Sequence, residues 1–231
     1  MAAFPIQIRA IAYDLDGTLV DSAGDLAYAA NLMREELNLP AIPESEIKTY
    51  IGKGIANLVR RAVMRGRAAD DVVSDAYVEQ ALAICERHYA QYMCRTTRPY
   101  PGVITGLEAA RDKGLRLACI TNKVARFTEP MLRELGLAQY FELTLSGDSL
   151  PEKKPHPAPL LYVAKFFNIT PQQLLMVGDS DNDVEAAKAA GSPVFFFPHG
   201  YHQAENIDNL GVDAVVQNLI AIADLVAHPG R

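Results

Sequence analysis

Short apolar runs alternate with longer amphipathic segments along most of the chain. Four runs have the length and composition of buried strands: residues 6–13, 115–120, 174–177 and 194–197. Segments of helical periodicity lie before or after these runs, at residues 103–113, 158–167 and 183–190, and a final helix is expected at 220–226. Alternating strands and helices predict an α/β fold whose parallel sheet is covered on both faces.

One stretch interrupts this alternation. From about residue 21 to residue 96 the sequence has no strand pattern and carries Ala-, Leu- and charge-rich segments of helical spacing, such as residues 25–37 and 74–93. The Pro/Gly-rich residues 98–102 mark its end. We therefore expect a core of residues 1–20 and 97–231 and an inserted all-α domain of residues 21–96.

Composition narrows the class of protein. The 231 residues carry 22 basic and 28 acidic side chains, a net charge of −6, and no basic tract, which argues against a nucleic-acid partner. No apolar run is long enough to span a membrane, and no signal peptide is apparent. Three cysteines without metal-ligand spacing favour a reducing compartment. We expect a cytoplasmic monomer or homodimer.

Polar residues follow the predicted strands where each strand ends. The first strand leads into residues 14–18 (DLDGT), the second into 121–123 (TNK) and the third into 179–183 (DSDND). Residues 153–157 (KKPHP) form a proline-restrained loop between the last two. Ligands bind beyond the carboxyl ends of parallel strands, so these side chains should converge at one edge of the sheet.

The carboxylates of this predicted edge indicate a particular chemistry. Unpaired carboxylates in one place repel one another, and a divalent cation relieves that repulsion. Oxygen ligands favour Mg²⁺, which is commonly shared with substrate phosphate, so the pattern points to phosphoryl transfer. Asp14 and Asp16 could divide the roles of nucleophile and general acid/base.

Four ordered motifs resemble those of the haloacid dehalogenase superfamily: residues 14–18, Thr121, residues 154–157 and residues 178–183. The similarity spans nearly the whole chain and is strongest to phosphatases with a helical cap inserted after the first motif. It implies a Rossmann-like core, an all-α cap, Mg²⁺ as cofactor and hydrolysis of a small phosphate ester. Residues 50–54 (YIGKG) and the residues around the last three motifs resemble those of phosphatases that act on 2-phosphoglycolate, and this resemblance implies 2-phosphoglycolate as the substrate.

The resemblance also implies roles for individual residues. Asp14 matches the nucleophile and a metal ligand, and Asp16 matches the general acid/base, whose backbone carbonyl also binds the metal. Asp179 matches the third metal ligand from the protein. Thr121 matches the hydroxyl that hydrogen-bonds the phosphoryl oxygens, and Asn122 beside it is expected to help bind the substrate.

Two further positions follow from the same resemblance. Lys154 matches the lysine that offsets negative charge on the nucleophile and phosphoryl group, although Lys153 is adjacent. Asp183 matches an acid that orients either metal-bound water or Lys154.

Basic residues outside the four motifs have two readings each. Lys53 of the cap, with Arg60 as a further candidate, could meet a carboxylate on the substrate, but residues 52–54 also fit a simple turn between helices. Lys123 could contact the substrate or lie on the surface.

Two other functions fit parts of the pattern. A sugar phosphomutase of the same superfamily would use Asp14 and Asp16 but pass the phosphoryl group to a sugar hydroxyl. A signalling receiver domain also gathers Asp, Thr and Lys around Mg²⁺, but receivers are uncapped and carry their acidic pair before the phosphoacceptor.

Two metal-site readings are weaker. The DxDxD run that begins at Asp179 imitates a calcium-binding loop, but Val184 and Ala190 occupy positions that require Gly and Glu. His199 and His202 have a ligand-like spacing but flank Gly200 in an expected loop. Asp181 is expected to be a solvated turn residue or a helix N-cap.

Overall fold

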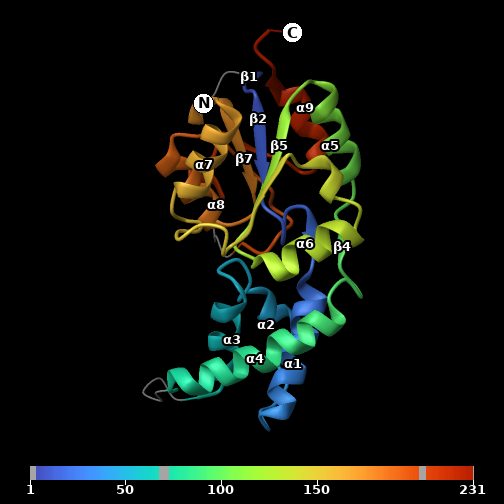
Figure 1. The fold of residues 1–231 in the computed structure, drawn as a ribbon, viewed down its shortest axis with the longest axis vertical. Helices are drawn as coiled ribbons and strands as arrows, with labels where there is room; N and C mark the ends of the chain where they lie inside the picture. Colours follow the sequence, from blue (N-terminus) through green and yellow to red (C-terminus); the bar gives the residue numbers. More distant parts are fainter. Residues whose placement is uncertain (1–3, 68–72, 203–206, 231) are drawn as a thin grey trace. The chain divides into compact units, whose positions relative to one another are not determined.

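A computed structural model describes residues 4–67, 73–202 and 207–230 of the chain. Its main element is a six-stranded parallel sheet with the strand order β6-β5-β2-β7-β8-β9 (Figure 1). The strands are β2 (Ala10–Tyr13), β5 (Arg116–Ile120), β6 (Leu143–Leu145), β7 (Leu174–Gly178), β8 (Val194–Phe196) and β9 (Ala214–Val215). The predicted α/β class with a parallel sheet is confirmed.

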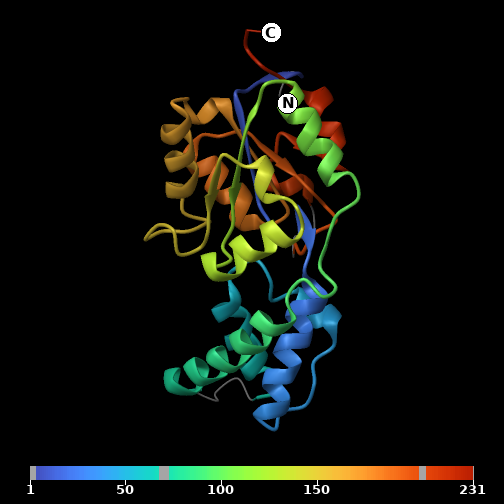
Figure 2. The same ribbon diagram turned by 45° about the vertical axis from the view of Figure 1, so that its right-hand side comes forward.

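Helices cover both faces of this sheet, as Figures 1 and 2 show. On one face, α7 (Ala158–Phe167) and α8 (Asp181–Ala190) pack on alternate residues of the central strands, including Ala10, Ala12 and Met176. On the other, α5 (Val103–Asp112) packs against β5 and against α9 (Ile222–Leu225). The α6 helix (Ala125–Glu134) follows β5 in the chain. The central strands are buried on both faces, which explains their nearly continuous apolar sequence.

The predicted first strand, residues 6–13, is in fact two strands. β1 (Ile6–Gln7) pairs with β10 (Val226–Ala227), whereas β2 lies in the main sheet between β5 and β7. The chain changes partners at Ile8, whose N–H donates to the carbonyl of Ala227.

The predicted helix at 220–226 is shorter than expected. It consists of a 3-10 turn at Leu219–Ala221 and the single turn α9, because Val226 already belongs to β10. The α8 helix begins at Asp181 rather than at residue 183, and Ser180, not Asp181, is its N-cap. The hydroxyl and N–H of Ser180 both donate to Asp183, a capping box that fixes the helix start.

The chain divides into two compact units, Met1–Asp21 with Pro99–Arg231 and Ser22–Arg98. The second unit contains α1 (Ala23–Glu36), α2 (Glu44–Lys48), α3 (Ile55–Met64) and α4 (Asp75–Tyr92). The chain leaves the first unit through β3 (Val20–Asp21) and returns through β4 (Arg98–Pro99), and these two strands form a small sheet.

A buried carboxylate joins the two ends of the second unit. Asp25 of α1 accepts hydrogen bonds from the backbone N–H and the hydroxyl of both Thr96 and Thr97. Burial opposes the charged carboxylate, but these donors outweigh it and hold the pKa of Asp25 below its usual value. Both ends of the inserted segment are thereby fixed to each other.

All three cysteines are buried free thiols. Within the described parts of the chain, every helix is too short or too polar to cross a membrane.

Candidate active site

A buried lysine joins two carboxylates at the carboxyl edge of the sheet. Asp14 directly follows β2, and Asp183 lies in the first turn of α8. The Lys154 Nζ lies 2.8 Å from Oδ1 of Asp14, 2.7 Å from Oδ1 of Asp183 and 2.6 Å from the carbonyl oxygen of Ile120. Lys154 is 3% exposed and Asp14 7% exposed, so this bridge is held away from water.

Asp179 follows β7 at the same edge and is held on both carboxylate oxygens. The Thr18 hydroxyl donates to Oδ1 at 2.7 Å, and the Tyr201 backbone N–H donates to Oδ2 at 2.7 Å. Two glycines permit this packing, because a Cβ at Gly17 or Gly200 would lie only 2.2 or 2.1 Å from Oδ2 of Asp179. Gly17 also has a φ of 93°, which favours glycine.

The electrostatics of this cluster favour a bound cation. Asp14, Asp179 and Asp183 each place one carboxylate oxygen within 4.8 Å of the others, and all three are buried. Burial raises the pKa of Asp14 to about 7, although Lys154 opposes the shift. Burial, then Asp14 and Asp183, raise the pKa of Asp179 well above its usual value.

Lys154 alone does not balance this charge. Burial disfavours its ammonium group, but Asp14 and Asp183 outweigh burial and raise the pKa of Lys154. The Lys154 ammonium group therefore contacts two of the three buried carboxylates, and Asp179 is left without this partner. A divalent cation would restore the balance, and the all-oxygen donor set fits a hard ion such as Mg²⁺.

Asp16 is paired with a lysine that the sequence left ambiguous. The Lys123 Nζ lies 3.0 Å from Oδ1 and 2.9 Å from Oδ2 of Asp16. Lys123 is 8% exposed, so it is not a surface lysine. Thr128 donates its hydroxyl to the Lys123 carbonyl oxygen and so fixes the lysine backbone at the start of α6.

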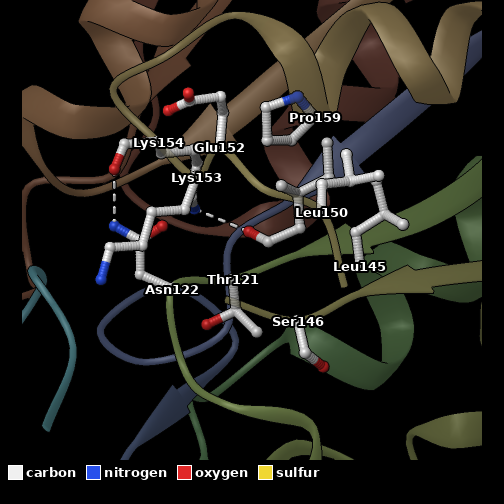
Figure 3. A pocket seen from close by; sticks show the side chains of 10 residues that line it. Thr121, Asn122, Leu145, Ser146, Leu150, Glu152, Lys153, Lys154 and Pro159 are labelled. Atoms are coloured by element: carbon white, nitrogen blue, oxygen red, sulfur yellow. Dashed lines mark hydrogen bonds between the residues drawn. The ribbon is translucent and has the colours of Figure 1, made fainter. Parts of the chain in front are cut away.

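Thr121 and Asn122 follow β5 and lie beside the Lys154 loop. The Asn122 amide donates to the Lys154 carbonyl oxygen at 2.9 Å (Figure 3). The Thr121 hydroxyl accepts from the Lys123 N–H at 3.1 Å. The cavity lined by these residues has a volume of about 10 Å³, too small for a phosphate ester.

The structure decides between the two adjacent lysines. Lys154 reaches Asp14, whereas Lys153 is exposed. Asp14, Lys154 and Asp183 therefore meet at this edge of the sheet beside Asp179, and Thr121 lines a small cavity together with Lys154.

Two basic residues of the second unit, Lys53 and Arg60, were candidates for substrate contact. Lys53 is exposed in a turn where Gly52 and Gly54 have φ values of 107° and 88°. Arg60 is exposed and pairs with Asp75 at 2.8 Å.

The two histidines lie in a loop after β8, as expected. His202 contacts the carbonyl oxygen of Pro198, and among the described residues neither histidine belongs to a cluster of three metal-ligating groups.

The contacts of Thr18 and Tyr201 with Asp179 were not anticipated from the sequence. Thr18 belongs to the first motif, so the sequence could have indicated that its hydroxyl lies at the site. Tyr201 contributes a backbone N–H, which every residue except proline carries. The residue type at this position therefore could not predict the contact.

The fold and site define a class of enzyme. Residues 11–197 match the model of the haloacid dehalogenase-like hydrolase family, and the chain belongs to this family. It is a hydrolase whose family motifs surround the buried lysine and carboxylates described above.

The names of similar proteins are more specific than the family description. The chain is 46% identical over 226 residues to a phosphoglycolate phosphatase of Thiobacillus denitrificans, covering 98% of this chain and 99% of that protein. It is 39% identical to the phosphoglycolate phosphatase of Escherichia coli K12, covering 92% and 90% of the two chains. The crystal structure of a predicted phosphoglycolate phosphatase from Haemophilus somnus superimposes with a TM-score of 0.88 at 36% identity, covering 94% and 96%.

Proposed function

We propose that this protein is a Mg²⁺-dependent phosphatase that hydrolyses 2-phosphoglycolate to glycolate and inorganic phosphate. The observation that carries the proposal is the buried bridge from Lys154 to Asp14 and Asp183, beside the carboxylate of Asp179. The names of the full-length relatives support the substrate. Residues 1–20 and 97–231 would form the catalytic core, and residues 21–96 the cap.

In the first half-reaction, a carboxylate oxygen of Asp14 attacks the phosphorus atom of the ester. The bond from phosphorus to the glycolate oxygen breaks, and protonated Asp16 gives that oxygen its proton. The products are glycolate and a phosphorylated Asp14. The paired Lys123 holds the Asp16 side chain in place for this transfer.

In the second half-reaction, the Asp16 carboxylate accepts a proton from a water molecule that attacks phosphorus. The bond from phosphorus to Asp14 breaks, which releases phosphate and regenerates both aspartic acids in their starting forms. Because this base already stands beside the nucleophile, the phosphoenzyme is short-lived, unlike the persistent phosphoenzyme of a receiver domain.

Lys154 and Thr121 stabilise the transferring group. Lys154 offsets negative charge on Asp14 and the phosphoryl oxygens, and Thr121 donates its hydroxyl to one of those oxygens. Asp14, Asp179 and the backbone carbonyl of Asp16 would hold Mg²⁺, while Asp183 orients Lys154. Bound Mg²⁺ supplies positive charge against the phosphoryl oxygens.

Asn122 and Lys53 complete the substrate contacts in this proposal. Asn122 helps bind the substrate beside Thr121, and Lys53 meets the carboxylate of 2-phosphoglycolate. Its exposure and its position between two glycines of positive φ support a mobile cation for this role.

The Lys53 contact can be tested with two substrates. Lys53→Ala should raise KM for 2-phosphoglycolate and leave KM unchanged for ethyl phosphate, which has no carboxylate. Lys48→Ala is a matched control, since Lys48 is a partly exposed lysine that pairs with Glu44 within α2. Unchanged KM and kcat for 2-phosphoglycolate in Lys53→Ala would remove Lys53 from the site.

The cellular compartment and the partner are part of the same proposal. Buried free thiols support a reducing compartment, and we assign the protein to the cytoplasm with a small phosphate ester as its partner.

The function is tested by phosphate release from a panel of small esters, with Mg²⁺ and with EDTA. We expect kcat/KM for 2-phosphoglycolate to exceed that of sugar phosphates by at least about tenfold, a difference of about 1.4 kcal/mol in transition-state binding. Asp14→Asn should release no phosphate. Conversion of a sugar phosphate into its isomer without phosphate release would instead indicate a phosphomutase.

A further inference from the structure

The loop that follows β8, residues 197–201, lies against the metal-site carboxylate Asp179. The Tyr201 N–H donates to Oδ2 of Asp179, and Gly200 approaches the same oxygen so closely that no side chain fits between them. Asp179 is 1% exposed. The orientation of this carboxylate therefore depends on where the backbone of Gly200 and Tyr201 lies.

The same loop contacts both points at which the chain crosses between the two units. The Tyr201 hydroxyl donates to Oδ1 of Asp21 at 2.7 Å, and Asp21 is the last residue before the chain leaves the first unit. Tyr100, one residue after the return at Pro99, donates its hydroxyl to the carbonyl oxygen of His199 at 3.4 Å. Its ring packs edge-on against Phe197 with centroids 5.3 Å apart.

We propose that Tyr201 is a positioning residue for cation binding. Its hydroxyl, anchored on Asp21, fixes the loop whose N–H orients Asp179, so that a change at the crossing strand β3 alters the affinity of the site for a divalent cation. This inference rests on the metal site of the proposed function. It assigns a role to a residue outside the four family motifs.

The physical basis is preorganisation of a ligand. A carboxylate held by donors on both oxygens loses less conformational freedom when a cation binds. Partners that orient metal ligands typically contribute about 10–100-fold to metal affinity. Tyr201 acts on Asp179 through one loop rather than directly through its hydroxyl, so we expect its removal to weaken binding by about tenfold, the lower end of that range.

The test is calorimetric titration of Mg²⁺ into the full-length protein without substrate. Tyr201→Phe removes only the hydroxyl, and Tyr162→Phe, on an exposed tyrosine of α7, is the matched control. The Kd for Mg²⁺ should rise about tenfold in Tyr201→Phe and stay unchanged in Tyr162→Phe. Gly200→Ala should lose most of the binding, because its Cβ would displace Asp179.

A double-mutant cycle separates the proposed route from general damage. Tyr201→Phe should weaken binding more in the wild-type background than in an Asp21→Ala background, because the hydrogen bond to Asp21 is already absent there and only the contact of the hydroxyl with Tyr100 remains. Thermal unfolding without Mg²⁺ checks that each variant is folded.

Three results would overturn the inference. A wild-type Kd in Tyr201→Phe shows that the hydroxyl does not position Asp179. An equal loss in both backgrounds shows that Asp21 is not the anchor. If the wild-type protein itself fails to bind Mg²⁺, the proposed metal site falls together with the inference, whereas the first two results leave the proposed function intact.

Discussion

Lys154→Met tests whether one buried ammonium group holds the site together. Methionine keeps most of the side-chain length and removes the charge. At 2.8 Å from Asp14, an attraction of about 6 kcal/mol is expected at an effective dielectric constant of about 20. The desolvation of the buried ions offsets much of this attraction, and removing one partner of a buried pair typically costs about 3–5 kcal/mol.

We expect Lys154→Met to lose about 3–5 kcal/mol of unfolding free energy at pH 8 in the metal-free protein. The loss should be smaller at pH 5. Burial already raises the pKa of Asp14 to about 7, and removing Lys154 raises it further, so the folded variant binds more protons than the unfolded chain. Unfolding free energy then falls as pH rises from about 4 through the raised pKa.

Urea unfolding at both pH values measures the stability, and phosphate release at a temperature where the variant is folded measures kcat. Loss of this electrostatic stabilisation should lower kcat by about 10²–10³-fold. Lys153→Met, on the exposed neighbour, is the control and should change neither quantity. A stability loss below about 1 kcal/mol, typical of an exposed pair, together with unchanged kcat would refute the reasoning.

Three further predictions concern other contacts. Lys123→Ala should lower kcat about 10–100-fold, which is part of the 10²–10⁴-fold that general acid/base catalysis contributes. Lys123→Arg should restore part of the lost kcat. Equal kcat in the wild type and both variants would contradict the pairing of Lys123 with Asp16. Asp25→Ala should cost about 2–4 kcal/mol in urea unfolding at pH 7, because buried donors of Thr96 and Thr97 lose their acceptor. The pKa of Asp25 is lowered in the fold, so this contribution is present above about pH 4 and shrinks as pH falls through that pKa; a pH-independent loss would argue against a charged acceptor. EDTA should abolish phosphate release and added Mg²⁺ should restore it while raising Tm, and full activity in EDTA would exclude the metal requirement.

The strands that carry the site were predictable because they are buried on both faces. Such strands read as short apolar runs, and β5, β7 and β8 lie within two residues of their predicted bounds. The edge strands β6 and β9 were missed because three and two residues are too few for a pattern to emerge.

The division of residues 6–13 into two strands depends on distant sequence. Ile8 changes partners because β10, at the far end of the chain, pairs with β1. The hydrophobic pattern of residues 6–13 alone cannot predict pairing with a strand at the other end of the chain.

The site was predictable to the extent that its chemistry lies in side chains at strand ends. The carboxylates and Lys154 occupy recognisable motifs, so their convergence followed from the parallel sheet. The pairing of Lys123 with Asp16 joins residues 107 positions apart and requires tertiary structure. Tyr201 supports Asp179 through a backbone N–H, so the amino-acid type at position 201 does not reveal this contact.

The most direct test of the account is to trap the covalent intermediate. The protein is mixed with 2-phosphoglycolate and Mg²⁺ and quenched during turnover with borohydride, which reduces an acyl phosphate to an alcohol. Peptide mass spectrometry should then find the reduced residue at position 14 and nowhere in Asp14→Asn. A reduced residue at another carboxylate, or none during measurable phosphate release, would contradict nucleophilic attack by Asp14.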